Sequence, residues 1–262
     1  MRSSIGLGLF DLTGRTAIVT GSTRGIGLAI ARQLGSAGAN VVVSSEDADD
    51  TGRVAAQLAE EGLRVAGKVC DVAEPAALRE LVGFALKEFG ALGILVCNAG
   101  ITGRRGAMAD LEEDDYRRVF AVNLDAAVRL ANIALPHIAD WGGGAAVMMS
   151  SISGLRGNRS INAYALSKAA LAQAARNFAI EWGASGVRVN AVSPGLIRTA
   201  ISEPLLADAG FRERRMRMTP LRRAGDPIEV AGAVHFLVSE AGAFVTGHNL
   251  VVDGGTVITD GS

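Results

Sequence analysis

The sequence has few of the residues that crosslink small extracellular domains or bind metal ions. It contains two cysteines, Cys70 and Cys97, and three histidines among 262 residues. Their spacing matches no metal-ligand pattern, and two distant cysteines do not make a disulfide framework. We therefore expect no metal, two buried free thiols and a reducing compartment, which indicates a cytoplasmic protein.

The chain also lacks an excess of charge of either sign and any long apolar run. Twenty-six Lys and Arg residues face 27 Asp and Glu residues, which leaves a net charge of −1. This balance argues against a nucleic-acid partner and against an anionic membrane surface. No stretch reaches the roughly 18 apolar residues of a membrane span, and the N-terminus has no signal-peptide pattern. We expect a soluble protein with no membrane partner.

Aromatic residues are scarce at 5%, so the apolar content of 49% consists mainly of Ala, Val, Leu and Ile. Short continuous apolar runs alternate with segments of helical periodicity. The expected strands cover residues 16–20, 40–44, 64–69, 93–97, 145–150, 187–193 and 249–253. The expected helices cover residues 25–38, 48–62, 75–90, 112–138, 162–185 and 227–239. Continuous runs suit strands buried on both faces, so the order predicts a doubly wound (Rossmann-type) α/β fold. It has a seven-stranded parallel sheet, helices on both faces and one domain over residues 1–262.

A glycine-rich loop, "TGSTRGIG" (20–27), follows the first expected strand and opens the first expected helix. Glycines let backbone N–H groups approach a phosphate closely, and the helix N-terminus adds partial positive charge. A tight turn is the alternative interpretation. The strand before the loop, the helix after it and a second strand about 20 residues on favour nucleotide binding.

The stretch "AYALSKAA" (163–170) places Tyr164 four residues before Lys168, on one face of a helix. Taken alone, the pair is an ordinary end to an apolar stripe. A lysine ammonium beside a phenol favours the phenolate, however, and we expect it to lower the tyrosine pKa. The pair would then be a tuned general acid and base.

Several motifs together resemble the short-chain dehydrogenase/reductase family. They are TGxxxGxG at 20–27, "NAG" at 98–100, Ser151, the Tyr164-x-x-x-Lys168 pair and, less specifically, "CDV" (70–72), "VNL" (122–124), "SPG" (193–195) and "VDGG" (252–255). The resemblance covers nearly the whole chain. It implies a nicotinamide-dependent oxidoreductase that acts on a small-molecule secondary alcohol or ketone without a metal.

The resemblance also implies roles for four catalytic residues. Tyr164 is the acid and base, and Lys168 binds the nicotinamide ribose and tunes the tyrosine. Ser151 holds the substrate oxygen; Ser150 and Ser153 are alternatives from the sequence, and the family's spacing selects Ser151. Asn123, unusual inside a helix, corresponds to the asparagine that holds a water linking the lysine to solvent.

Cofactor contacts follow from the same matches. The expected cofactor-binding residues, besides Tyr164 and Lys168, are Gly21, Ser22, Thr23, Arg24, Gly25, Ile26, Gly27, Ser45, Glu46, Asp71, Val72, Asn98, Ala99, Gly100, Pro194, Gly195, Ile197 and Thr199.

The choice between NAD and NADP depends on the end of the second strand, "VVVSSED" (41–47). Glu46 and Asp47 favour NAD, because a carboxylate repels the 2′-phosphate of NADP. Arg24, Ser44 and Ser45 favour NADP. A carboxylate against a dianionic phosphate is the stronger effect, so we expect NAD(H), with NADP(H) as the alternative.

Substrate residues are expected in the loop 152–161 and in a lid at about 197–225. The lid arginines Arg212, Arg214, Arg215, Arg217, Arg222 and Arg223 either meet an acidic substrate or form a solvated helix face. The long helices 112–138 and 162–185 lie outside the sheet and, by the resemblance, pair into a homotetramer or homodimer.

Three other functions remain open. A reductase of 3-oxoacyl chains on acyl carrier protein is weakened because Gly142 and Ser185 stand where such enzymes tend to have arginine. A non-catalytic cofactor-binding regulator would not need all four catalytic residues. A nucleotide-sugar epimerase or dehydratase usually has a further C-terminal domain.

Overall fold

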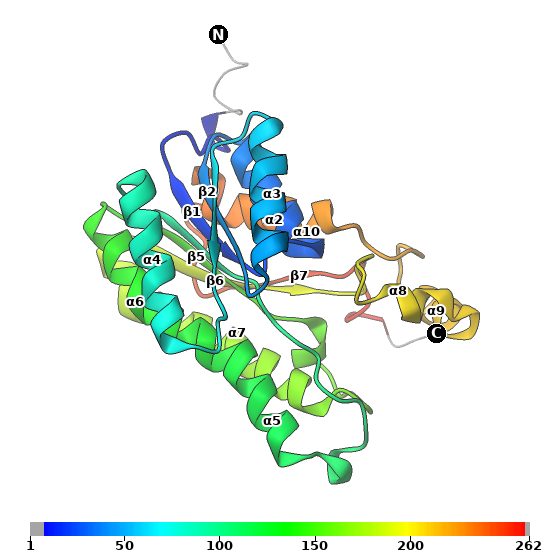
Figure 1. The fold of residues 1–262 in the computed structure, drawn as a ribbon. Coiled ribbons are helices and arrows are strands. Elements are labelled where there is room, and N and C mark those ends of the chain that lie inside the picture. Colours follow the sequence, from blue (N-terminus) through cyan, green and yellow to red (C-terminus); the bar gives the residue numbers. More distant parts are fainter. Residues whose placement is uncertain (1–7, 260–262) are drawn as a thin grey trace.

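The sheet contains seven strands and is covered by helices on both faces in the computed structural model, which describes residues 8–259 (Figure 1). The strands are β1 (Thr16–Thr20), β2 (Asn40–Ser45), β3 (Val65–Val69), β4 (Ile94–Cys97), β5 (Gly144–Met149), β6 (Val187–Pro194) and β7 (Asn249–Val252). Their order is β3-β2-β1-β4-β5-β6-β7, and every neighbouring pair is parallel. The expected fold class and all seven expected strands are confirmed.

Helices cover both faces of the sheet. The α-helices of the described residues are α2 (Gly25–Ser36), α3 (Ala48–Glu60), α4 (Pro75–Phe89), α5 (Glu113–Phe120), α6 (Ala126–Asp140), α7 (Asn162–Trp182), α8 (Glu203–Ala207), α9 (Ala209–Arg217) and α10 (Pro227–Val238). Buried residues of α4, α6 and α7 form one core cluster with the sheet, and those of α2, α3 and α10 form the other. Figure 1 shows α2, α3 and α10 together on one face.

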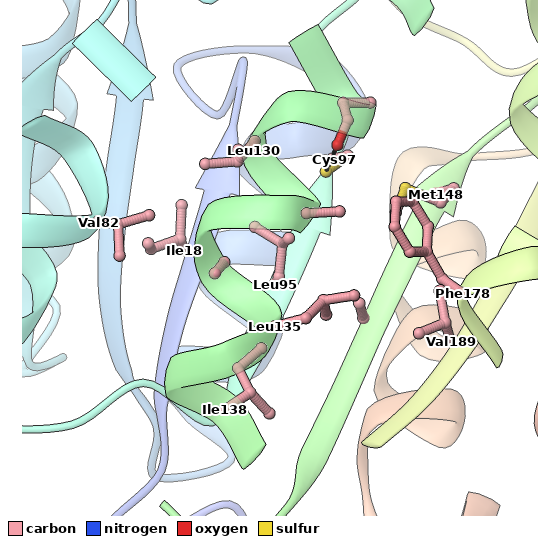
Figure 2. Packing of buried hydrophobic residues seen from close by; sticks show 14 of the residues in the cluster. Ile18, Val82, Leu95, Cys97, Leu130, Leu135, Ile138, Met148, Phe178 and Val189 are labelled. Atoms are coloured by element: carbon pink, nitrogen blue, oxygen red, sulfur yellow. Dashed lines mark hydrogen bonds between the residues drawn. The ribbon is translucent and has the colours of Figure 1, made fainter. Parts of the chain in front are cut away.

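Alternate residues of each central strand feed the two cores. Ile18 of β1 joins the cluster of α4, α6 and α7, whereas its neighbours Ala17 and Val19 join the opposite one. Figure 2 shows Ile18 and Leu95 beneath α6, whose Leu130, Leu135 and Ile138 point toward the sheet. Full burial of each such side chain is worth about 1.5–3 kcal/mol, which explains why these strands read as continuous apolar runs.

Local signals set the helix ends. Pro75 occupies the first turn of α4, and Gly90 ends that helix with a left-handed φ of 79°. The Asp47 side chain caps α3 by accepting a hydrogen bond from the Asp50 N–H at 2.8 Å. These caps place the helix starts next to the carboxyl ends of the preceding strands.

A continuous helix over Glu113–Asp140 joins α5, a π-helical turn at Ala121–Asp125 and α6. By length and composition it could cross a membrane, which the search for uninterrupted apolar runs did not predict. In this fold its α6 part packs against the sheet (Figure 2), and 44% of its most apolar window is buried. The buried core helix of a soluble protein can have the same length and apolar composition as a membrane span.

Candidate active site

The site lies where the sheet order reverses. Strand β1 has β2 on one side and β4 on the other, so the chain leaves these strands toward opposite faces. In open α/β sheets, ligands bind outside the carboxyl ends of the strands at such a switch point. The glycine loop follows β1, the "NAG" segment follows β4, and Ser151 follows β5.

The glycine loop is shaped by close contact and by backbone conformation. A Cβ on Gly27 would lie 2.1 Å from the Gly21 carbonyl oxygen and 2.4 Å from Asn98 Nδ2, so no side chain fits there. Gly21 and Gly25 have positive φ values of 60° and 56°. Arg24 precedes α2, and no side chain caps that helix terminus. This leaves a cradle of backbone N–H groups that fits a phosphate.

Ser22, within this loop, holds it to the neighbouring strands. The Ser22 hydroxyl is fully buried, donates to the Val19 carbonyl at 2.6 Å and accepts from the Ser44 N–H at 2.8 Å. Thr23 is also buried. Sequence reasoning placed Ser22 among the cofactor contacts, whereas its side chain here is committed to joining β1 and β2.

Asn98 joins β4 to the glycine loop. Its Nδ2 donates to the carbonyl oxygens of Thr20 and Gly21, each at 2.9 Å. The Thr20 hydroxyl in turn accepts from the backbone N–H groups of Asn98 and Ala99, at 3.0 and 3.1 Å. Thr20 was not among the expected site residues, although it opens the quoted glycine motif.

Lys168 is buried beside this segment. Its Nζ donates to the Met149 carbonyl oxygen at 2.7 Å, and a Cβ on Gly100 would lie 3.3 Å from the same Nζ. Burial lowers the pKa of Lys168 to about 8, because the ammonium has lost its hydration. Ser150, an alternative to Ser151 from the sequence, donates to the Lys168 carbonyl at 2.7 Å and thus supports the helix backbone instead.

Asn123 lies in the π-helical turn, a feature often found at functional sites. Its Oδ1 accepts from the Ile101 N–H at 2.8 Å, and its Nδ2 donates to the Ile101 carbonyl at 2.9 Å and to the Ser167 hydroxyl at 3.0 Å. Asn123 therefore ties the loop after β4 to α7. Ser167 was missed from the sequence; its only signal was a hydroxyl directly before Lys168 in an apolar helix.

Tyr164 and Ser151 meet above Lys168. Tyr164 is half-buried, and the Lys168 Nζ lies 5.6 Å from the centre of its ring. Burial raises the pKa of Tyr164 above its ordinary 10, and a hydrogen bond with Ser151 opposes that rise. The expected lowering by Lys168 does not occur in the protein alone, because the cost of desolvating the phenolate prevails. The phenol therefore keeps its proton at neutral pH.

The end of β2 presents an exposed carboxylate, that of Glu46. Glu46 is exposed, and its Oε2 accepts from the Ser45 hydroxyl at 3.4 Å. Ser44, which would have favoured NADP, is fully buried. Further along the edge, Asp71 is exposed, and Val72 and Ala99 line one small hollow.

The chain leaving β6 passes the same edge. Pro194 ends β6, Gly195 lies against Asp253, and Ile197 is buried. Thr199 contacts the glycine loop, because a Cβ on Gly25 would lie 3.3 Å from Thr199 Cγ2. Segments that follow β1, β4, β5 and β6 are thus gathered at one edge of the sheet.

Comparisons with known proteins show to which family a chain with this arrangement belongs. A family model described as enoyl-(acyl carrier protein) reductase matches residues 21–257. The dehydrogenase/reductase SDR family member 4 of Bos taurus is 40% identical over 246 residues, which cover 94% of this chain and 88% of that protein. The chain belongs to the short-chain dehydrogenase/reductase family.

Solved structures of short-chain dehydrogenases/reductases have the same fold. A gluconate 5-dehydrogenase from Burkholderia cenocepacia in complex with NADP and tartrate is 35% identical, with a TM-score of 0.93 and coverage of 97% and 99% of the two chains. A 7α-hydroxysteroid dehydrogenase complexed with NADH and 7-oxo glycochenodeoxycholic acid is 33% identical, with a TM-score of 0.91 and coverage of 95% and 96%. The protein is thus an oxidoreductase of this family that acts on CH–OH groups.

Proposed function

We propose that this protein transfers hydride between a nicotinamide cofactor and the carbinol or carbonyl carbon of a small secondary alcohol or ketone, with Tyr164 as general acid and base. The convergence of Tyr164, Ser151 and buried Lys168 beside the glycine cradle carries this proposal. A pure cofactor-binding regulator would need the cradle but not these three side chains.

The residues of the glycine loop, with Asn98, Ala99 and Gly100, would hold the cofactor, since the space beside Gly27 and the free helix terminus suit a dinucleotide phosphate. A bound nicotinamide supplies or accepts the hydride. Ser151 donates a hydrogen bond to the substrate oxygen, and Tyr164 gives that oxygen a proton during carbonyl reduction. Lys168 returns a proton to Tyr164, and a water held at Asn123 would link Lys168 to solvent.

NAD(H) is the proposed cofactor. The exposed Glu46 carboxylate at the end of β2 opposes a 2′-phosphate, and burial of Ser44 removes one of the hydroxyls that would attract it. Arg24 and Ser45, whose hydroxyl donates to Glu46 at 3.4 Å, remain in favour of NADP. Solved relatives carry either cofactor, NADH in one and NADP in another.

We also propose a cytoplasmic homotetramer. Both cysteines are buried and unpaired, which suits a reducing compartment. Leu166 and Ile180 on α7 are 44% and 85% exposed, and Phe244 is fully exposed, so the surface offers apolar side chains to further copies.

Tyr164→Phe tests the mechanism. It removes the proton that reaches the substrate oxygen, so we expect turnover to fall by about 10²–10⁴-fold. Affinity for reduced nicotinamide, measured by its fluorescence, should stay unchanged. The matched control is Tyr116→Phe, since Tyr116 is the other tyrosine and stacks on Phe120 at 4.4 Å. A Tyr164→Phe protein that keeps most of its kcat would reject the proposed role.

A further inference from the structure

The arginines between β6 and α10 do not all have the same surroundings. Six are exposed, namely Arg198, Arg212, Arg214, Arg217, Arg222 and Arg223. Among them, Arg198 is paired with Asp226 and Arg223 with Glu229. The seventh, Arg215 on α9, is half-buried. The charge pattern alone predicts one solvated face for these residues. In the structure, however, the Arg215 side chain is half-buried.

The Arg215 side chain has no polar partner in the part of the chain that the structure describes. Its Nε is buried without a hydrogen bond, and no carboxylate among residues 8–259 forms an ion pair with it. The acid that acts on its charge is Asp253, whose carboxylate already accepts from the N–H groups of Gly255 and Val257 at 2.8 and 2.7 Å. Buried donors without partners are rare, so this one points to a missing acceptor.

A second arginine lies near the first. Arg156, in the loop after Ser151, is close enough to act on the charge of Arg215. This loop is held in place, because Asn158 Nδ2 donates to the Arg156 and Ser153 carbonyls at 2.9 and 2.8 Å. The start of this loop packs on α7, the helix that carries Tyr164 and Lys168, since a Cβ on Gly154 would lie 2.6 Å from the Ala169 nitrogen.

The electrostatics of the pair favour an anion. Burial lowers the pKa of Arg215, the charge of Arg156 adds to that lowering and Asp253 opposes both effects, so the pKa is about 10. Two guanidinium groups beside one carboxylate leave about one positive charge without a counterion. A carboxylate matches that charge and the planar fork of a guanidinium.

This position differs from that of the cofactor phosphates. The glycine loop meets the chain after β6 at Thr199. Arg215 instead stands over the end of β7: its carbonyl accepts from the Thr219 hydroxyl at 2.9 Å, and Thr219 is hydrogen-bonded to Thr256 at 3.0 Å. Strands β4, β5 and β6 separate β1 from β7 in the sheet.

We infer that Arg215 and Arg156 bind a carboxylate on the substrate, so that preferred substrates are ketones or secondary alcohols that carry a carboxylate group. The inference rests on the proposed function and specifies its substrate class. Arg215 is a specificity-determining residue here and takes no part in proton transfer.

The test compares straight-chain keto acids of several lengths with their neutral methyl esters. The wild-type enzyme should prefer the acid of the best length. Arg215→Leu should lower kcat/KM for that acid by about tenfold to a hundredfold, the usual worth of a charge-assisted hydrogen bond, and leave the ester unchanged. Arg214→Leu, the same change on the exposed neighbour, should alter neither. Arg215→Lys should retain part of the preference if the charge is what matters.

A binding measurement separates this inference from the proposed function. Calorimetry of glutarate with the cofactor-saturated protein should show binding that Arg215→Leu and Arg156→Leu each weaken. If no alcohol or ketone is turned over but this binding is present, the hydride-transfer function fails and the anion site stands. Equal use of acids and esters by the wild-type enzyme, or an equal loss of both in Arg215→Leu, would overturn the anion site.

Discussion

Lys168→Met should separate stability from activity. The lysine is 4% exposed, and burial lowers its pKa from 10.5 to about 8. At about 1.36 kcal/mol per pKa unit, holding the buried ammonium costs the folded protein about 3 kcal/mol at pH 7. Methionine has a similar length and removes that cost. It also removes the hydrogen bond to the Met149 carbonyl, worth about 1.5–3 kcal/mol because the donor is charged.

The two effects nearly offset each other at neutral pH, so the variant should unfold with a free energy equal to the wild-type value or about 1 kcal/mol above it, while turnover is lost. The pH dependence is the sharper result. A lysine whose folded pKa is depressed destabilises the fold fully below about pH 8, and this penalty disappears as pH rises toward 10.5. Between pH 7 and 9.5 the wild-type protein should therefore gain about 2 kcal/mol relative to the variant.

Urea unfolding of the cofactor-free protein at the two pH values measures both quantities. Lys87→Met is the control, since Lys87 is exposed in the last turn of α4 and should change stability by no more than about 0.5 kcal/mol at either pH. A Lys168→Met protein that is destabilised by the same large amount at both pH values would refute the reasoning, because the amine would then be a net stabilising group.

Two further substitutions test the cofactor site. Gly27→Ala should abolish cofactor binding, measured by fluorescence titration, because its Cβ would lie 2.1 Å from the Gly21 carbonyl; Gly83→Ala on α4, where nothing lies within 4 Å, should instead stabilise the protein by up to about 1 kcal/mol. Glu46→Arg should move the ratio of kcat/KM values from NAD toward NADP, and an unchanged ratio would show that Glu46 does not select the cofactor.

The sheet was predictable because its signal is local. Each strand lies in a continuous apolar run, and the expected limits agree with the observed ones within one residue. The glycine loop and the Tyr164 and Lys168 positions were likewise visible from motif spacing. The π-helical turn was not, because residues 112–138 have an unbroken helical pattern and the turn depends on Asn123 reaching Ile101.

The remaining properties of the site, such as pKa values and hydrogen-bond partners, depend on burial. Burial cannot be deduced from residue type. A tyrosine four residues from a lysine predicts a lowered phenol pKa, yet desolvation raises it. Seven arginines in the segment 197–225 look equivalent in the sequence, yet only Arg215 is half-buried. Ser22 and Ser150 donate their hydroxyl groups to backbone carbonyls, whereas the Ser151 hydroxyl accepts from the Ser153 N–H at 3.1 Å.

The two ends of the segment 197–225 are joined: Ile197 forms a β-bridge with Gly225, and the Arg198 N–H donates to the Gly225 carbonyl at 2.8 Å. Residues between these ends and beyond Thr199, which lies beside Gly25 of the glycine loop, can change length or composition without disturbing β6 or α10, since loop length adds little to the entropy of closure. Exchange of this part of the segment among homologues can therefore change the substrate specificity of the enzyme. The residues that transfer the proton and hold the cofactor would stay the same.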